Sequence, residues 1–151
     1  MNNSIYLANT ILHRAFDENI KVTNLKLQKL LYFVYSEYLR IFDKILLDEN
    51  FAVWKYGPVL ESVYSIFKIY GANRIDELAL DSNGKLIIFD ENKSPRLEVA
   101  ISNVWDKFKN YDGVTLYEIT HKEGSAWQKA KQRQNYYMED YDEIKNDNWR
   151  E

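Results

Sequence analysis

Residues that could carry acid–base or metal chemistry are few in this chain. It has 2 histidines, His13 and His121, and no cysteine, which excludes thiol nucleophiles, disulfides and thiolate metal sites. Glu118 and His121 have the Glu-x-x-His spacing of di-iron helical bundles, which places both side chains on one helix face. Such a site needs a second copy of the motif and two further glutamates, and the chain has one copy. We therefore predict no metal site.

Loops that bind phosphate or expose a nucleophile are absent from the sequence. No G-x-x-x-x-G-K-[ST] or G-x-G-x-x-G pattern occurs, so neither a P-loop nor a dinucleotide loop is indicated. No G-x-S-x-G nucleophile elbow occurs either. Catalysis therefore has little support in these residues, and no cofactor is predicted.

Two short helices expected over 116–122 and 126–134 leave a DNA-binding helix-turn-helix as an alternative. Lys129, Lys131 and Arg133 would give the second helix positive charge, but Trp127 would occupy the first turn, where base-reading side chains are expected. The net charge is −3 and both signs are interspersed, which gives no electrostatic footprint for a phosphate backbone. Nucleic acid is therefore not the first choice of partner, and a DNA-binding regulator or phage antirepressor remains the alternative.

The element that must position the other residues is a helix over about 23–42. Apolar residues at helical spacing form a stripe along this helix. Phe33, Tyr35 and Leu39 widen the stripe until it covers most of the circumference of the helix, which predicts burial on several sides. Charged residues interrupt the run, so it does not predict a membrane span. A polar edge of Gln28, Lys29 and Tyr32 is expected to stay at the surface. The apolar stripe comprises Leu27, Leu30, Leu31, Val34, Tyr38, Ile41 and Phe42.

Caps and periodicity predict further helices over about 4–16, 58–70 and 95–110. Capping boxes are expected at Thr115 with Glu118 and at Ser125 with Gln128. A strand is expected over 51–56, and a small hairpin over 78–89 around an Asn-Gly turn. The predicted fold is a mainly α, compact single-domain helical bundle with a small β element.

Composition is that of one folded domain. The chain has 151 residues, 46% hydrophobic and 15% aromatic, which is enough for a core and too aromatic for disorder. No basic region followed by an apolar stretch starts the sequence, so no signal peptide is predicted, and we expect a cytoplasmic protein without a membrane partner. Residues 136–151 form an acidic, aromatic C-terminal tail in this interpretation.

Several motifs in order resemble the signature of the SocA-like family, also called the Panacea antitoxin domain. The first is LQKLLY at 27–32, followed by the acidic pair Asp48-Glu49 and by WKYGPV at 54–59. A second block over 104–131 is similar to the C-terminal pattern of the family, with Leu116, Thr120-His121 and Trp127 in place. The resemblance covers about residues 5–131, which makes it far more specific than any single motif.

The resemblance implies a protein that binds and neutralises a toxin encoded beside it, in prophages or other mobile elements. It implies a mainly helical fold with a small β element and no enzymatic activity. One branch of the family is described as an adaptor that delivers its toxin to a cytosolic protease, so adaptor function is the alternative within this class. The oligomeric state and the class of toxin are left open.

The expected toxin-binding surface combines the polar edge of the helix over 23–42 with the loop that follows the predicted strand. A short connection should return that loop beside the helix. Trp54 and Tyr56 could instead anchor the loop in the core, since both residue types serve core and interface alike. The predicted surface consists of Gln28, Lys29, Tyr32, Trp54, Lys55, Tyr56, Gly57 and Pro58.

Overall fold

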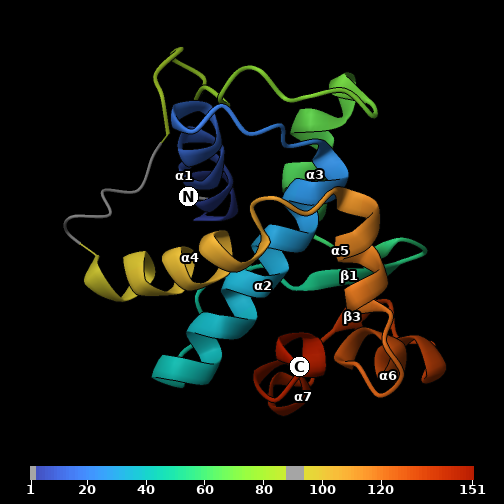
Figure 1. The fold of residues 1–151 in the computed structure, drawn as a ribbon. Coiled ribbons are helices and arrows are strands. Elements are labelled where there is room, and N and C mark those ends of the chain that lie inside the picture. Colours follow the sequence, from blue (N-terminus) through green and yellow to red (C-terminus); the bar gives the residue numbers. More distant parts are fainter. Residues whose placement is uncertain (1–2, 88–93) are drawn as a thin grey trace.

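Helix α2, Asn24–Phe42, lies at the centre of the computed structural model and is surrounded by the other elements (Figure 1). The structure describes residues 3–87 and 94–151. Every residue from Lys26 to Glu37 is buried, which confirms the prediction of a central buried helix. Thr23 is the N-cap, as expected, and its Oγ1 accepts a hydrogen bond from the Lys26 backbone N–H over 3.2 Å.

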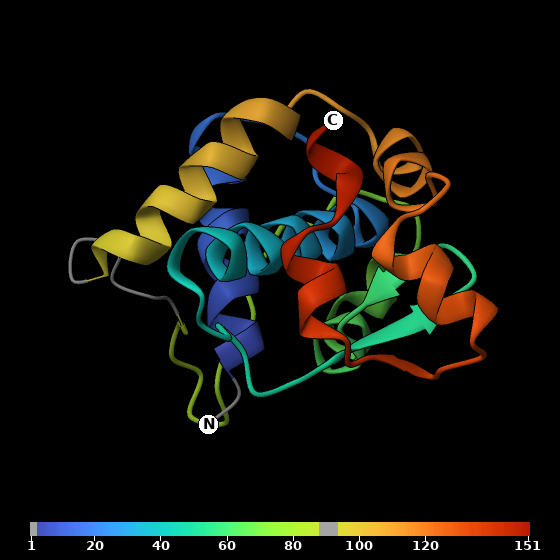
Figure 2. The ribbon, with the colours of Figure 1, turned by 90° about the horizontal axis from the view of Figure 1, so that it is seen from below.

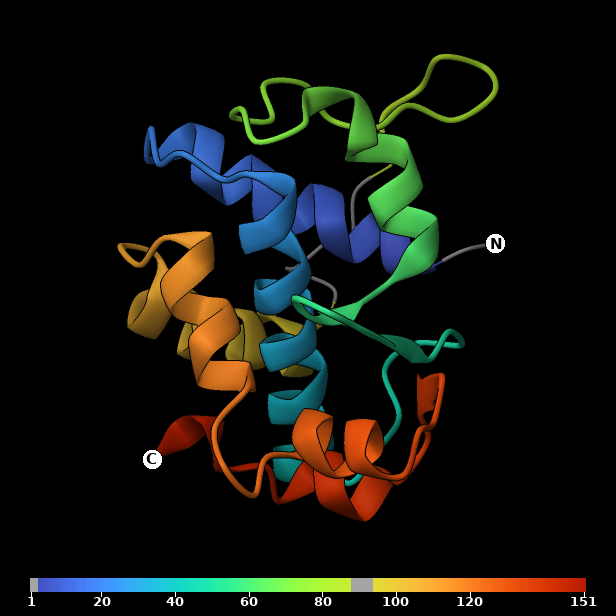
Figure 3. The same ribbon diagram turned by 90° about the vertical axis from the view of Figure 1, so that its right-hand side faces the viewer.

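The remaining helices pack around α2 rather than forming a layer beside it. Figure 3 shows α4 and α5 on one side of α2 and the small sheet on the other. The predicted mainly α fold with a small β element is confirmed. The surrounding helices are α1 (Asn3–Asp17), α3 (Glu61–Phe67) with the 3-10 helix η1 (Lys68–Tyr70), α4 (Pro95–Phe108), α5 (Gly113–Thr120), α6 (Ala126–Gln132), α7 (Tyr141–Lys145) and the 3-10 helix η3 (Asn148–Arg150).

The sheet is antiparallel with strand order β2-β1-β3, made of β1 (Phe51–Trp54), β2 (Gly57–Val59) and β3 (Tyr137–Met138). Strand β1 pairs Ala52 with Val59 on one side and Phe51 with Met138 on the other. The prediction that Pro58 begins a helix is wrong, because Gly57 at φ +103° turns the chain back beside β1. The helix begins only at Glu61.

Two other local predictions have different outcomes. At α5 the cap is Asp112, whose carboxylate accepts from the Thr115 N–H over 2.8 Å, so the helix begins earlier than expected and the capping box at Thr115 is wrong. The box at Ser125 is confirmed, since its Oγ accepts from the Gln128 N–H over 3.1 Å. The arms of the expected hairpin over 78–89 meet in an antiparallel bridge between Leu80 and Leu86, and residues 88–89 lie outside the described residues.

The last segment of the chain, interpreted from sequence as a tail, packs against α2. It runs from β3 through α7 to η3 and crosses the central helix (Figure 2). Trp149 is buried, with its ring centroid 4.8 Å from that of Phe33 and 5.8 Å from that of Phe108. This segment therefore contributes to the core. Among the described residues, no helix is both long and apolar enough to cross a membrane.

The burial of α2 predicts a large cost for removing apolar volume from its centre. Leu31 has no exposed surface, so Leu31→Ala should lower the free energy of unfolding by about 2–5 kcal/mol, measured by urea denaturation. Ile69→Ala is the matched control, because this side chain is 88% exposed and its truncation should change stability little. Equal midpoints for the two variants would contradict a core centred on α2.

Candidate functional site

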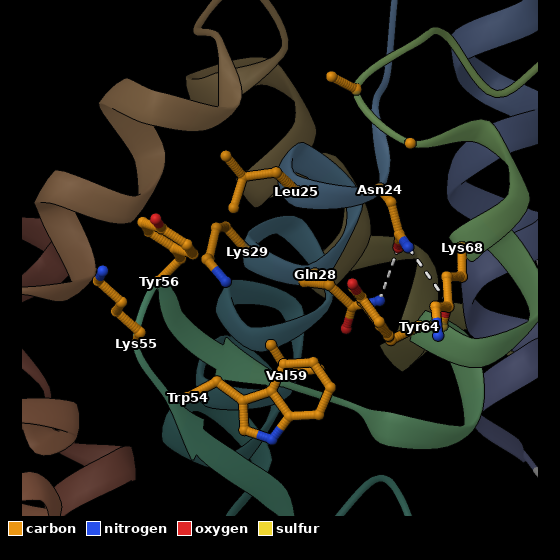
Figure 4. A pocket seen from close by; sticks show the side chains of 12 residues that line it. Asn24, Leu25, Gln28, Lys29, Trp54, Lys55, Tyr56, Val59, Tyr64 and Lys68 are labelled. Carbon is orange, nitrogen blue, oxygen red and sulfur yellow. Dashed lines mark hydrogen bonds between the residues drawn. The ribbon is translucent and has the colours of Figure 1, made fainter.

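A pocket of about 680 Å³ opens between the first turns of α2, the β1–β2 turn and the segment from α3 to η1 (Figure 4). This volume lies within the range of about 300–1,000 Å³ that is typical of ligand sites. Segments that are far apart in the sequence contribute side chains to this pocket, because the β1–β2 turn brings the chain back over α2. The lining consists of Asn24, Leu25, Gln28, Lys29, Trp54, Lys55, Tyr56, Val59, Tyr64, Lys68, Gly71 and Ala72.

Five of the eight residues predicted as a binding surface line this pocket: Gln28, Lys29, Trp54, Lys55 and Tyr56. The structure therefore brings the helix and the loop together, as expected from their short connection.

Two more predicted residues, Gly57 and Pro58, do not line the pocket but contact the lining residue Lys29. The Lys29 ammonium donates to the Pro58 carbonyl oxygen over 2.9 Å. A Cβ at Gly57 would lie 2.9 Å from Lys29 Cε and 2.8 Å from Thr120 Oγ1, so only glycine fits where the turn approaches α2.

The prediction that Gln28, Lys29 and Tyr32 form an exposed polar edge is wrong. Their exposed fractions are 1%, 0% and 0%. The physical reason is that each polar group has a partner inside the protein. Gln28 donates to Asn24 over 3.0 Å and accepts from the Leu60 N–H over 2.9 Å. Tyr32 lies away from the pocket, where its hydroxyl donates to Asp147.

Lys29 is the unusual group of the pocket, because its ammonium is buried without a carboxylate. Burial lowers the pKa of Lys29 from 10.5 to about 7. Among the described residues, the Pro58 carbonyl oxygen is its hydrogen-bond acceptor and no acidic side chain forms an ion pair with it. In Figure 4 the side chain points toward the β strands between Tyr56 and Trp54.

Aromatic side chains form the walls. The Trp54 ring packs edge-on against Tyr64, with centroids 4.8 Å apart, and is half-buried. Tyr56 is 53% exposed and packs edge-on against Tyr117 at 5.8 Å. Trp54 is therefore anchored in the protein, while Tyr56 remains at the surface, and a role of either residue in toxin binding stays a prediction.

The β1–β2 turn is hydrogen-bonded by Trp127 of α6 and lies close to His121, which caps the C-terminal end of α5. Trp127 Nε1 donates to the Trp54 carbonyl oxygen over 3.0 Å, and His121 Nε2 lies 3.0 Å from the Lys55 carbonyl oxygen. The Trp127 and His121 rings lie against each other at a tilt, with their centroids 3.7 Å apart. The other ring nitrogen of His121 lies 2.8 Å from the Tyr117 carbonyl oxygen. Within residues 3–87 and 94–151, no group of three or more His, Cys, Asp or Glu side chains could hold a metal.

Sequence reasoning missed Asn24, Tyr64 and Lys68 as pocket residues. Tyr64 and Lys68 are four positions apart, so they share a face of the segment from α3 to η1. That spacing is a signal that could have identified them. Asn24 gave no such signal, because its role depends on a 3.2 Å hydrogen bond to the Tyr64 carbonyl oxygen.

Comparison with known proteins places these residues in a family. Residues 27–128, which contain the whole pocket lining except Asn24 and Leu25, match the family described as "Antitoxin SocA-like, Panacea domain". The chain belongs to the SocA-like antitoxin family.

One curated relative of the SocA-like antitoxin family is "Antitoxin SocA" of Caulobacter vibrioides (strain NA1000 / CB15N). The chain is 30% identical to it over 124 residues, which are 80% of this chain and 66% of that protein. The chain thus spans slightly less than two thirds of the length of this relative. No solved structure matches the chain.

The buried ammonium predicts a pH dependence of stability. The folded-state pKa of Lys29, about 7, is below its ordinary value of 10.5, so between these values the unfolded state binds more protons. The free energy of unfolding should therefore rise with pH in this window relative to the Lys29→Met variant, by up to about 1.4 kcal/mol per pH unit. Below about pH 7 the ammonium is charged in both states and the difference becomes constant.

Urea titrations of the parent and Lys29→Met between about pH 6 and about pH 9 test this prediction. A stability difference that is independent of pH throughout would show that burial does not shift the pKa of Lys29.

The Tyr32–Asp147 contact predicts a structural role for Tyr32. Asp147 Oδ1 accepts from the Ala126 and Asn148 N–H groups over 3.0 and 2.8 Å, while burial raises the pKa values of both Tyr32 and Asp147. Tyr32→Phe removes the hydroxyl but keeps the ring, so it should cost about 1–3 kcal/mol of unfolding free energy. An unchanged denaturation midpoint would show that this buried hydrogen bond is dispensable.

Proposed function

We propose that this chain is an antitoxin that neutralises a partner toxin by direct complex formation, without catalysis. The observation that carries the proposal is membership of the SocA-like antitoxin family, through a matched region that includes most of the pocket. The toxin is proposed to be encoded by a neighbouring reading frame and to be met in the cytoplasm.

The surface around the pocket has the chemistry of a protein interface. Trp and Tyr are the side chains most often found as anchors of binding energy, and Tyr56 and the half-buried Trp54 are accessible at the pocket. Ile69, which follows the lining residue Lys68 in the chain, is an exposed apolar side chain (88%). These features support a protein partner, and they make the pocket the proposed centre of the complex.

Co-expression of the chain with the neighbouring gene tests the proposal. The toxin alone should arrest growth, and co-expression should restore it while both proteins copurify as one complex. Tyr56→Ser should weaken copurification at unchanged thermal midpoint, because its exposed ring contributes little to the core. Tyr136→Ser is the matched control, since Tyr136 is 57% exposed and lies outside the pocket lining.

Toxin abundance in the rescued cells separates the two ways in which growth could return. A neutralising antitoxin leaves toxin abundance unchanged or higher, whereas an adaptor for a cytosolic protease lowers it. Growth rescue with loss of the toxin, restored to full abundance in a protease-deficient strain, would replace direct neutralisation by adaptor function. Failure to copurify with any neighbouring gene product would overturn the proposal.

A further inference from the structure

We infer that the pocket receives a segment of the toxin that inserts a large apolar side chain, while acidic residues on both sides of that side chain pair with Lys55 and Lys68 at the rim. This inference rests on the proposed function and specifies the chemistry of the partner at the same site. Both lysines line the opening and are exposed, so a partner reaches them directly from solvent.

The buried polar side chains of the lining are already bonded inside the protein. Asn24 donates to the Tyr64 carbonyl oxygen over 3.2 Å and accepts from Gln28 over 3.0 Å. Lys29 has no exposed surface and donates to the Pro58 carbonyl oxygen over 2.9 Å. An occupant therefore gains little hydrogen bonding from these groups, and the burial of apolar surface becomes its main source of binding energy.

The walls that an occupant would touch are apolar. Leu25, Trp54 and Tyr64 are half-buried and come from three different segments, and in Figure 4 Leu25 lies across the pocket from Trp54 and Val59. The volume of about 680 Å³ is in the range that holds a drug-sized body, so it has room for a large aromatic or aliphatic side chain. Aromatic side chains bury about 150–250 Å² each and dominate the energetics of interfaces.

Insertion of a side chain is favoured over addition of a strand to the sheet. Strand β2 is an edge strand and contributes Val59 to the lining. However, Gly57, Pro58 and Val59 are all buried, and Pro58 has no N–H to offer to a partner strand. The partner backbone thus finds no open edge here, and the inferred segment binds through its side chains.

The rim supplies positive charge on opposite sides of the opening. Lys55 on the β1–β2 turn and Lys68 in η1 lie on opposite sides of the pocket in Figure 4. Across residues 3–87 and 94–151, neither lysine forms an ion pair, and the lining contains no Asp or Glu. Carboxylates that flank the inserted side chain would therefore meet an ammonium group on either side, whereas a basic segment would be repelled.

Filling the pocket tests the apolar contact. Ala72 is exposed and lines the pocket, so Ala72→Trp places a ring in the opening without removing core volume. The variant should bind the copurifying toxin about 30-fold more weakly, the effect of losing an anchor residue, in calorimetric titrations of the full chain. Asn73→Trp is the matched control, because Asn73 is exposed and outside the lining, and this variant should bind like the parent.

Reversing the rim charges tests the acidic flanks. Lys55→Glu and Lys68→Glu should each lower the association rate constant at least about 2-fold at low salt, measured by stopped-flow mixing with the toxin. The difference should vanish near about 1 M salt, where the screening length falls to about 3 Å. Lys44→Glu makes the same change in net charge at an exposed position beyond the other end of α2, and it should leave the rate unchanged.

Synthetic peptides that tile the toxin sequence locate the segment. One peptide should compete with the whole toxin, and changing its large apolar residue to Ser should remove that competition. An Asp or Glu of this segment changed to Lys in the toxin should restore the association rate with Lys55→Glu or Lys68→Glu. Such a charge exchange identifies the carboxylates that flank the inserted side chain.

The outcomes separate this inference from the proposed function. If folded Ala72→Trp binds the toxin like the parent, or if both charge reversals leave the association rate unchanged, the inference is overturned and the proposed function stands. Self-association of the toxin-free chain that Ala72→Trp abolishes would assign the pocket to a second copy and also overturn it. The charge reversals test the inference even if Ala72→Trp fails to fold. If the parent does not bind the toxin, the proposed function itself fails.

Discussion

A helix buried on all sides cannot leave its polar side chains in water, and this constraint determines how the rest of the chain is arranged around α2. Buried donors and acceptors must be paired, or each costs free energy comparable to a lost hydrogen bond. Along α2 several buried polar groups on successive turns pair with other parts of the chain, whereas the buried Tyr35 hydroxyl has no partner among the described residues. Lys26 donates to Lys109 after α4, Lys29 to Pro58 in β2, Tyr32 to Asp147, and Ser36 to the Ile144 carbonyl oxygen in α7.

The same pairs explain why the pocket lies at one end of α2 and the C-terminal segment at the other. Ser36 also accepts from Trp149 Nε1 over 2.9 Å, and Glu37 accepts from Arg150 over 3.1 Å, so the C-terminal segment encloses Ser36 and Glu37. At the other end Lys29 donates to the Pro58 carbonyl oxygen and is buried beneath the pocket. The pocket thus opens at the end of α2 where the polar side chains pair with β2 and the residue after it, and not with the C-terminal segment.

Sequence periodicity predicted the central helix and its Thr23 cap, because these depend on local spacing and on one short hydrogen bond. It could not predict the burial of Gln28, Lys29 and Tyr32, since a polar residue that faces solvent and one that pairs internally look the same in a periodic pattern. Pro58 misled for a related reason: proline suits the first turn of a helix and also an edge strand. Only the pairing of Val53 with Pro58 distinguishes the two.

Much of the candidate site was predictable because most of it comes from one helix and the turn next to it in sequence. Family resemblance marked the segments LQKLLY and WKYGPV, and the structure brings parts of both to one pocket. The lining takes Gln28 and Lys29 from the first segment and Trp54, Lys55, Tyr56 and Val59 from the second. The wall contributed by Tyr64 and Lys68 was not predicted, since the start of α3 was placed too early. The support that Trp127 and His121 give to the turn depends on contacts across more than 60 residues, which local patterns do not contain.

The hydrogen bonds between α2 and the C-terminal segment have a consequence for the rate of folding. Tyr32 and Asp147 are 115 positions apart, and Ser36 and Trp149 are 113 apart. Helical proteins usually fold fast because their contacts are local, but here the central helix completes its hydrogen bonds only after a loop of more than a hundred residues has closed. Its folding rate should therefore resemble that of mixed α/β domains more than that of a simple helical bundle.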